Sequence, residues 1–170
     1  MPSQINDTAV HYAEYVVPRI VLGTNGRQGN ALTGSMRITM GASEPFEFVW
    51  SDRDGIPIGL QGLTAKLVFW AADRFESEEF MEHQPSSVVL AKRVVVRDPL
   101  EGLGFVLLTG DDTTRLAQEA RSKGIRWGLY LLNSSGDVFP CVVSENGNRW
   151  GTLHIEAASS MPDMESVRRA

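Results

Sequence analysis

The sequence predicts a mainly β fold: an antiparallel β-sandwich of about seven or eight strands, with one or two short helices. Three observations support this prediction. Apolar and polar residues alternate with a period of two in one stretch after another from residue 36 onward. Short turn sequences rich in Asp, Gly, Asn and Pro separate these stretches. Their spacing suits antiparallel hairpins better than alternating strands and helices.

The first 35 residues differ from the rest of the chain. Residues 11–23 are apolar and aromatic, whereas residues 24–35 contain three glycines and show no periodicity. We expect either a first strand of the same domain or an arm on a flexible loop that docks on a neighbouring subunit. The anchors of such an arm would be Tyr12, Tyr15, Val16, Val17 and Ile20. The predicted organisation is thus an arm and loop (1–35), a sandwich (36–156) and a C-terminal tail (157–170).

Strands are expected at residues 45–51, 63–70, 86–98, 103–109, 126–133, 138–144 and 152–156. The residues expected to share one face are Phe46, Phe48 and Trp50 in the first stretch, Ala65, Leu67 and Phe69 in the second, Leu103, Phe105 and Leu107 in the fourth, and Trp127, Leu129 and Leu131 in the fifth. The sequence GLYLLN-SSGD-VFPCVVS is the clearest hairpin.

Two segments interrupt the strand pattern. Residues 111–124 predict a short helix with an Asp or Thr cap, with Leu116, Ala117 and Ala120 on one face and with Lys123 and Gly124 at its end. Residues 72–87 are polar and acidic, and they predict a short helix or a loop between the sheets.

Composition argues against several classes of function. The net charge is -5 and the basic residues do not cluster, which disfavours binding to nucleic acid. The apolar runs stop far short of the roughly 20 residues that cross a bilayer, so no membrane span is expected. The start lacks the pattern of a signal peptide, and the single cysteine, Cys141, allows no intrachain disulfide. We therefore expect assembly in the cytosol.

The candidate metal and cofactor motifs are incomplete. Asp52 and Asp54 precede Gly55 as in half of a calcium loop, but no later carboxylate completes it. The glycine-rich residues 24–35 lack the Gly-Lys-Ser/Thr ending of a phosphate-binding loop. The histidines, at positions 11, 83 and 154, are far apart in the chain. We expect no metal and no cofactor.

Catalytic constellations are equally incomplete. Cys141 lies in an apolar strand; a dyad with His83 or His154 stays open, although no local signature favours it. Ser86 and Ser87 lack the glycines of a nucleophile elbow. Glu78 and Glu82 would share a helical face, where solvated carboxylates are the usual outcome. We assign no catalytic residue and expect a protein that is not an enzyme.

The four tryptophans divide into two groups. Trp50 and Trp127 fall on faces expected to point inward. Trp70 is out of phase with Phe69, and Trp150 follows a loop, so either ring could stack on a sugar or anchor a partner protein. Trp70 and Trp150 are therefore candidate interface residues.

A series of turn and core residues adds a family resemblance. They are Asp52 or Asp54, Gly55, Pro57, Leu60 and Gly62, then LTAKLVFW, Asp98, Pro99, Gly102, FVLLT, Asp112-Thr113, Tyr130 and Gly136-Asp137. In this order they resemble the N-terminal immunoglobulin-like domain of phage upper baseplate and tail proteins, over roughly residues 36 to 156. The acidic segment 72–87, the long helix and the first 35 residues have no counterpart in that pattern.

The resemblance implies an immunoglobulin-like sandwich in a virion structural protein. Such a protein would act in a tail or baseplate as an adaptor for fibres or receptor-binding proteins. Its partners would be further copies of itself and other virion proteins, assembled in the host cytoplasm. Two alternatives stay open: a glycan-binding module for host recognition on the same fold, and a capsid decoration protein.

Overall fold

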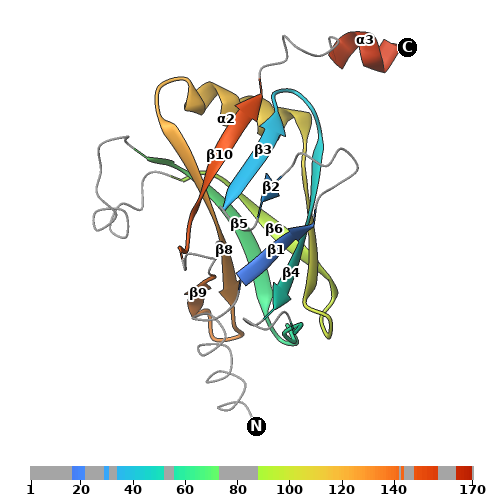
Figure 1. Ribbon diagram of the computed structural model, residues 1–170, viewed down its shortest axis with the longest axis vertical. Coiled ribbons are helices and arrows are strands. Elements are labelled where there is room, and N and C mark those ends of the chain that lie inside the picture. The colour runs from blue at the N-terminus through green and yellow to red at the C-terminus, as the bar shows by residue number, and fades with distance from the viewer. Residues whose placement is uncertain are drawn as a thin grey trace.

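The computed structural model describes residues 17–21, 29–30, 34–51, 56–72, 88–141, 143, 148–156 and 164–169. Its strands are β1 (Val17–Val21), β2 (Gly29–Asn30), β3 (Ser35–Thr39), β4 (Glu44–Ser51), β5 (Thr64–Ala72), β6 (Val88–Asp98), β7 (Leu103–Leu108), β8 (Gly124–Leu132), β9 (Val138–Pro140) and β10 (Gly151–Glu156). Its helices are α2 (Gly110–Ala120) and α3 (Met164–Arg169). Figure 1 shows the strands wrapped around a common interior, with α2 across one end.

The strands follow the hydrogen-bonded order β1-β4-β7-β6-β5-β8-β10-β3-β2, and β9 pairs with β8. The long strand β6 belongs to two layers, because Val94 pairs with Ala65 of β5 whereas Val95 pairs with Phe105 of β7. One layer therefore contains β4, β7 and the end of β6, and the other contains β5, β8 and β10. This division of strands is that of an immunoglobulin-like sandwich, which confirms the predicted fold class.

One strand pair departs from the antiparallel arrangement that the sequence predicts. Strands β3 and β10 run parallel, in register from Ser35 opposite Thr152 to Thr39 opposite Glu156. β10 corresponds to the last predicted strand, whereas no strand was predicted at residues 35–39; closing the second layer places β3 beside β10. The other strand pairs among the described residues are antiparallel.

The core forms where the alternating faces of the two layers meet. Phe46, Phe48 and Trp50 are fully buried on β4, as expected, and the ring centroids of Phe48 and Trp127 lie 6.4 Å apart across the layers. The Trp127 indole N–H donates a hydrogen bond of 3.0 Å to the carbonyl of Gly34. Both tryptophans that the sequence assigns to the core are therefore core residues.

Strand β7 has two apolar faces. Leu103, Phe105 and Leu107 share one face, as predicted, and this face points outward; the alternate residues of β7 are buried. Gly104 is one of those buried residues. A Cβ at this position would lie only 2.9 Å from Cζ3 of Trp50, so the position has no room for a larger side chain. The Trp50 ring thus occupies space that a larger residue on β7 would fill.

Helix α2 begins with a reciprocal cap. The Asp112 N–H donates to Oγ1 of Thr109 (3.2 Å), and the Thr109 N–H donates to the Asp112 carboxylate (2.9 Å). Lys92 of β6 lies 2.6 Å from the same carboxylate. Partial burial opposes ionisation of Asp112, but these contacts outweigh it and lower the pKa of the carboxyl. The helix ends at Ala120, earlier than predicted, because Gly124 already belongs to β8.

The predicted turn between β6 and β7 has the expected chemistry. The carboxylate of Asp98 accepts hydrogen bonds from the N–H groups of Leu100 and Glu101, and Gly102 adopts a φ of 63°. The acidic residues 73–87 and the partial calcium motif at residues 52–55 lie outside the described residues.

Candidate functional site

The two candidate tryptophans, Trp70 and Trp150, come together on the outer face of β8. In the strand register, Trp70 of β5 lies opposite Arg126 of β8, and Arg126 lies opposite Thr152 of β10. Trp150 immediately precedes β10. The central strand β8 therefore brings together residues from two distant parts of the chain.

A glycine makes this approach possible. A Cβ on Gly128 would lie 3.2 Å from two ring atoms of Trp70 and 3.3 Å from the carbonyl oxygen of Arg149. The Trp70 indole therefore lies across the backbone of β8. The segment that carries Trp150 reaches the same point from the other side.

Arg126 completes the cluster with a cation–π contact. Its guanidinium carbon lies 3.8 Å from the centroid of the Trp150 ring, and both residues are half-buried. At this distance the guanidinium stacks on the ring and fixes its orientation. We refer to Trp70, Arg126, Gly128, Tyr130 and Trp150 as the tryptophan surface.

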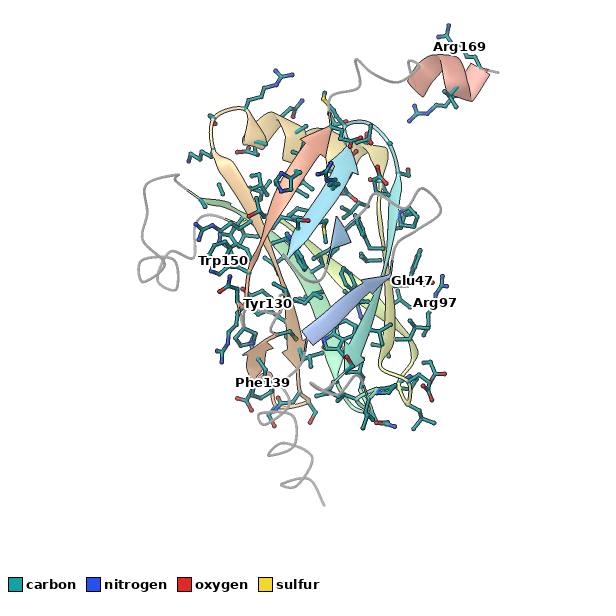
Figure 2. All side chains as sticks on the ribbon, viewed as in Figure 1. Glu47, Arg97, Tyr130, Phe139, Trp150 and Arg169 are labelled. Carbon is teal, nitrogen blue, oxygen red and sulfur yellow. The ribbon has the colours of Figure 1, made fainter. Side chains whose placement is uncertain are left out.

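Tyr130 extends the tryptophan surface along β8. It is separated from Gly128 by one inward-facing residue, so it shares the outer face, and Figure 2 shows Tyr130 and Trp150 on the same side of the molecule. Burial raises the pKa of the Tyr130 phenol, and the nearby Cys141 adds to this effect. The phenol therefore stays protonated to a higher pH than an exposed tyrosine side chain.

Two of the predicted arm residues, Val17 and Ile20, lie in a described strand. Tyr12, Tyr15 and Val16 lie outside the described residues. The backbones of Val17 and Ile20 form part of β1, which pairs with β4 in the other layer. Of the described arm residues, Val17 and Ile20 therefore do not belong to the tryptophan surface.

The structure does not bring together the candidate dyad of Cys141 and His154. Cys141 is fully buried, and its sulfur accepts a hydrogen bond of 3.3 Å from the Trp50 indole. Burial raises the pKa of this thiol to about 12. His154 is exposed on the outer face of β10, as its alternation predicts. His83, the other candidate partner of Cys141, lies outside the described residues.

The other candidate groups also lie outside the described residues: His11, Glu78, Glu82, Ser86 and Ser87. Within the part of the chain that the structure describes, no group of three or more His, Cys, Asp or Glu side chains is placed to hold a metal ion. Neither of the two described helices has the length and hydropathy to cross a bilayer.

A shallow groove of about 500 Å³ lies where the end of α2 meets β8 and β10. Its lining includes the apolar residues Met40 and Ile125, and its charged or titratable residues include Lys123, His154 and Glu156. Groups of both signs therefore surround an apolar floor, and this arrangement favours no single charge class of ligand.

Sequence reasoning identified the tryptophans of the surface but missed Arg126, Gly128 and Tyr130. The signal for these three was present, because they alternate with Trp127, Leu129 and Leu131, which were assigned to the core. No local sequence pattern predicts that these three residues lie close to Trp150.

No family model matches the sequence, and no curated protein matches it. The chain shows distant similarity to several solved structures. One is a chain from work on T cell activation by the bacterial superantigen toxic shock syndrome toxin-1 (7% identity, TM-score 0.35, 83% of this chain and 99% of that chain). Another is murine CRIg (7% identity, TM-score 0.33, 82% of this chain and 97% of that chain). A third is the titin domains Z1Z2 in complex with telethonin (14% identity, TM-score 0.29, 72% of this chain and 44% of that chain). The function proposed below rests on none of these similarities.

Proposed function

We propose that this protein is a non-enzymatic structural component of a phage tail or baseplate, which acts as an adaptor that binds other virion proteins. The tryptophan surface is the observation that carries the adaptor role. It combines two indoles, a guanidinium and a phenol, all partly exposed, on the outer face of one layer. Trp, Tyr and Arg are the residue types most enriched among the energetically dominant residues of protein interfaces.

The order within the tryptophan surface supports protein recognition. Arg126 is already stacked on Trp150, and Trp70 is already seated over Gly128. Rings that are held in place before binding lose little conformational freedom on association. A partner that covers this surface therefore gains the burial of large side chains at a small entropic cost.

The virion setting rests on the sequence resemblance described above. In that setting the protein would be present in several copies, assembled in the host cytoplasm. A capsid decoration protein would share the same binding chemistry and differ only in its position on the particle. Electron microscopy of the particle with a labelled chain distinguishes these two positions.

The test is incorporation into particles released from cells that express the encoding genome. We expect mass spectrometry to find the wild-type chain in purified particles. Trp70→Ala and Arg126→Lys variants are expected to fold but to be depleted from the particles. Arg126→Lys keeps the charge and removes the planar group that stacks on Trp150. The matched control is Thr64→Ala, an exposed position on the same strand as Trp70.

Absence of the wild-type chain from the particles would refute the virion role. Incorporation of both variants at the wild-type level would refute the role of the tryptophan surface. The glycan-binding alternative is tested separately by titrating the purified protein with host surface glycans and following tryptophan fluorescence. We expect no response, and a saturable change that Trp150→Ala abolishes would favour glycan recognition.

A further inference from the structure

The layer opposite the tryptophan surface has an unusually apolar outer face. Three neighbouring strands contribute to it, and we call it the β4–β7–β6 face. Its outward residues are Pro45, Glu47, Val49, Leu103, Phe105, Leu107, Val95 and Arg97. Val95 is 57% exposed and Leu107 is 45% exposed. Figure 2 shows Glu47 and Arg97 on the side of the molecule opposite Tyr130 and Trp150.

Away from the tryptophan surface, the outer face of the second layer is polar. Its exposed positions on β5 and β10 include Thr64, Lys66, Thr152 and His154. These are polar residues of the kind that a solvated sheet face carries. The exposed Val95 and Leu107 give the β4–β7–β6 face an affinity for apolar side chains.

The two charged side chains of this face, Glu47 and Arg97, meet over its centre. Phe105 of the middle strand lies opposite Glu47 on one side and opposite Val95 on the other. The guanidinium carbon of Arg97 lies 4.1 Å from the Phe105 ring centroid, and an Nη1 to Oε1 distance of 4.0 Å separates Arg97 from Glu47. The Arg97 side chain therefore extends from β6 over the Phe105 ring of β7 toward the Glu47 carboxylate of β4.

This distribution of charge is self-complementary. A two-fold axis parallel to β7 places β4 of one copy over β6 of another. Glu47 of each copy then faces Arg97 of the other, and the Arg97 side chains that cover the two Phe105 rings lie near the axis. A two-fold interface requires a patch that complements itself in this way. We infer that the β4–β7–β6 face binds a second copy of this chain.

The size of the face sets the strength of the contact. Three strands at about 4.8 Å spacing and about six residues at 3.3 Å give a footprint near 14 by 20 Å. This is smaller than the roughly 800 Å² per partner of a stable interface. The isolated dimer is therefore weak, with a dissociation constant in the micromolar range or above. Copies held close together in a larger assembly would still form the contact, because their effective concentration is high.

The test uses the purified full-length chain and two opposite charge changes. Sedimentation velocity from about 1 µM to about 1 mM spans the expected dissociation constant. The wild-type chain is expected to shift from monomer to dimer with rising concentration. Glu47→Arg alone and Arg97→Glu alone are each expected to weaken the dimer at least tenfold, because each places like charges across the interface.

Mixing the two variants gives the decisive result. In a mixed dimer, the introduced arginine faces the introduced glutamate, and the native Arg97 of one chain faces the native Glu47 of the other. Association is therefore expected to return toward the wild-type level. In each variant, the residues at positions 47 and 97 carry the same charge. If the Glu47–Arg97 pair acted only within one chain, mixing the two variants would therefore not restore association. Lys66→Glu, an equal charge change on the other layer, is the control and is expected to leave the dimer unchanged.

A wild-type chain that stays monomeric at every concentration, or a mixture that shows no rescue, would overturn the inference. The inference deepens the proposed function by naming one partner and its surface. Its test needs no virion, so the dimer and the incorporation into particles can each fail while the other holds.

Discussion

Raising the pH through the alkaline range is expected to destabilise the fold through the thiol of Cys141. Burial raises the pKa of this thiol from 9.0 to about 12, and the hydrogen bond from Trp50 only partly offsets the burial. In the unfolded chain the thiol ionises near its ordinary pKa. Its contribution to stability is therefore fully present below about pH 9 and is lost progressively as the pH rises toward 12.

The magnitude follows from the difference between the two pKa values. Each unit of difference corresponds to about 1.4 kcal/mol, so the free energy of unfolding falls by about 4 kcal/mol across the full range. The raised pKa of Tyr130 acts in the same direction at higher pH. A Cys141→Ala variant removes the thiol contribution and keeps the effect of burial on the phenol. Below about pH 10, where the phenol does not yet ionise, the difference in slope between the two proteins therefore isolates Cys141.

The assay is urea unfolding of both proteins at about pH 8, 9, 10 and 11, combined with labelling of the thiol. Above about pH 9, the wild-type chain is expected to lose about 1.4 kcal/mol more per pH unit than the variant. A disulfide reagent at pH 8 is expected to label the thiol only after unfolding. Equal slopes, or fast labelling of the native protein, would refute the reasoning and reopen a catalytic role for Cys141.

Three further predictions test the fold and the arm. Gly102→Ala is expected to lower the free energy of unfolding by more than about 2 kcal/mol, measured in urea, because it combines a positive φ with a Cβ 2.6 Å from the carbonyl oxygen of Trp50. Thr109→Ala removes the cap of α2 and is expected to cost about 1 kcal/mol in the same assay; an unchanged midpoint would contradict the role of the cap. Deleting residues 1–16 is expected to preserve the circular dichroism spectrum, because β1 keeps its pairing with β4, and to deplete the chain from particles. Normal incorporation would show that the arm anchors are dispensable.

The sequence predicted the strands well where one face is apolar and the other is not. Alternation in β4 placed Phe46, Phe48 and Trp50 in the core without ambiguity. In β7 both faces are apolar, so alternation separated the two sets of residues but did not say which set points inward. The Trp50 ring decides this, because it needs the space above Gly104. That contact joins two strands and is invisible to any local pattern.

The tryptophan surface was predictable only in part, because it also depends on contacts between strands. The phase of Trp70 against Phe69 indicated an outward ring, and the loop before Trp150 indicated exposure. The stacking of Arg126 on Trp150 depends on the register of β8 with β10, which follows from the closure of the second layer. The parallel pairing of β3 and β10 has the same origin and was likewise missed.

The parallel pair of β3 and β10 also has a mechanical consequence. The chain enters β3 at residue 35 and leaves β10 at residue 156, and these two points lie at opposite ends of the paired strands. Tension applied between them shears the whole ladder at once, instead of peeling it open one bond at a time. A subunit tethered at these two points would resist a pulling force far better than one joined through an antiparallel hairpin.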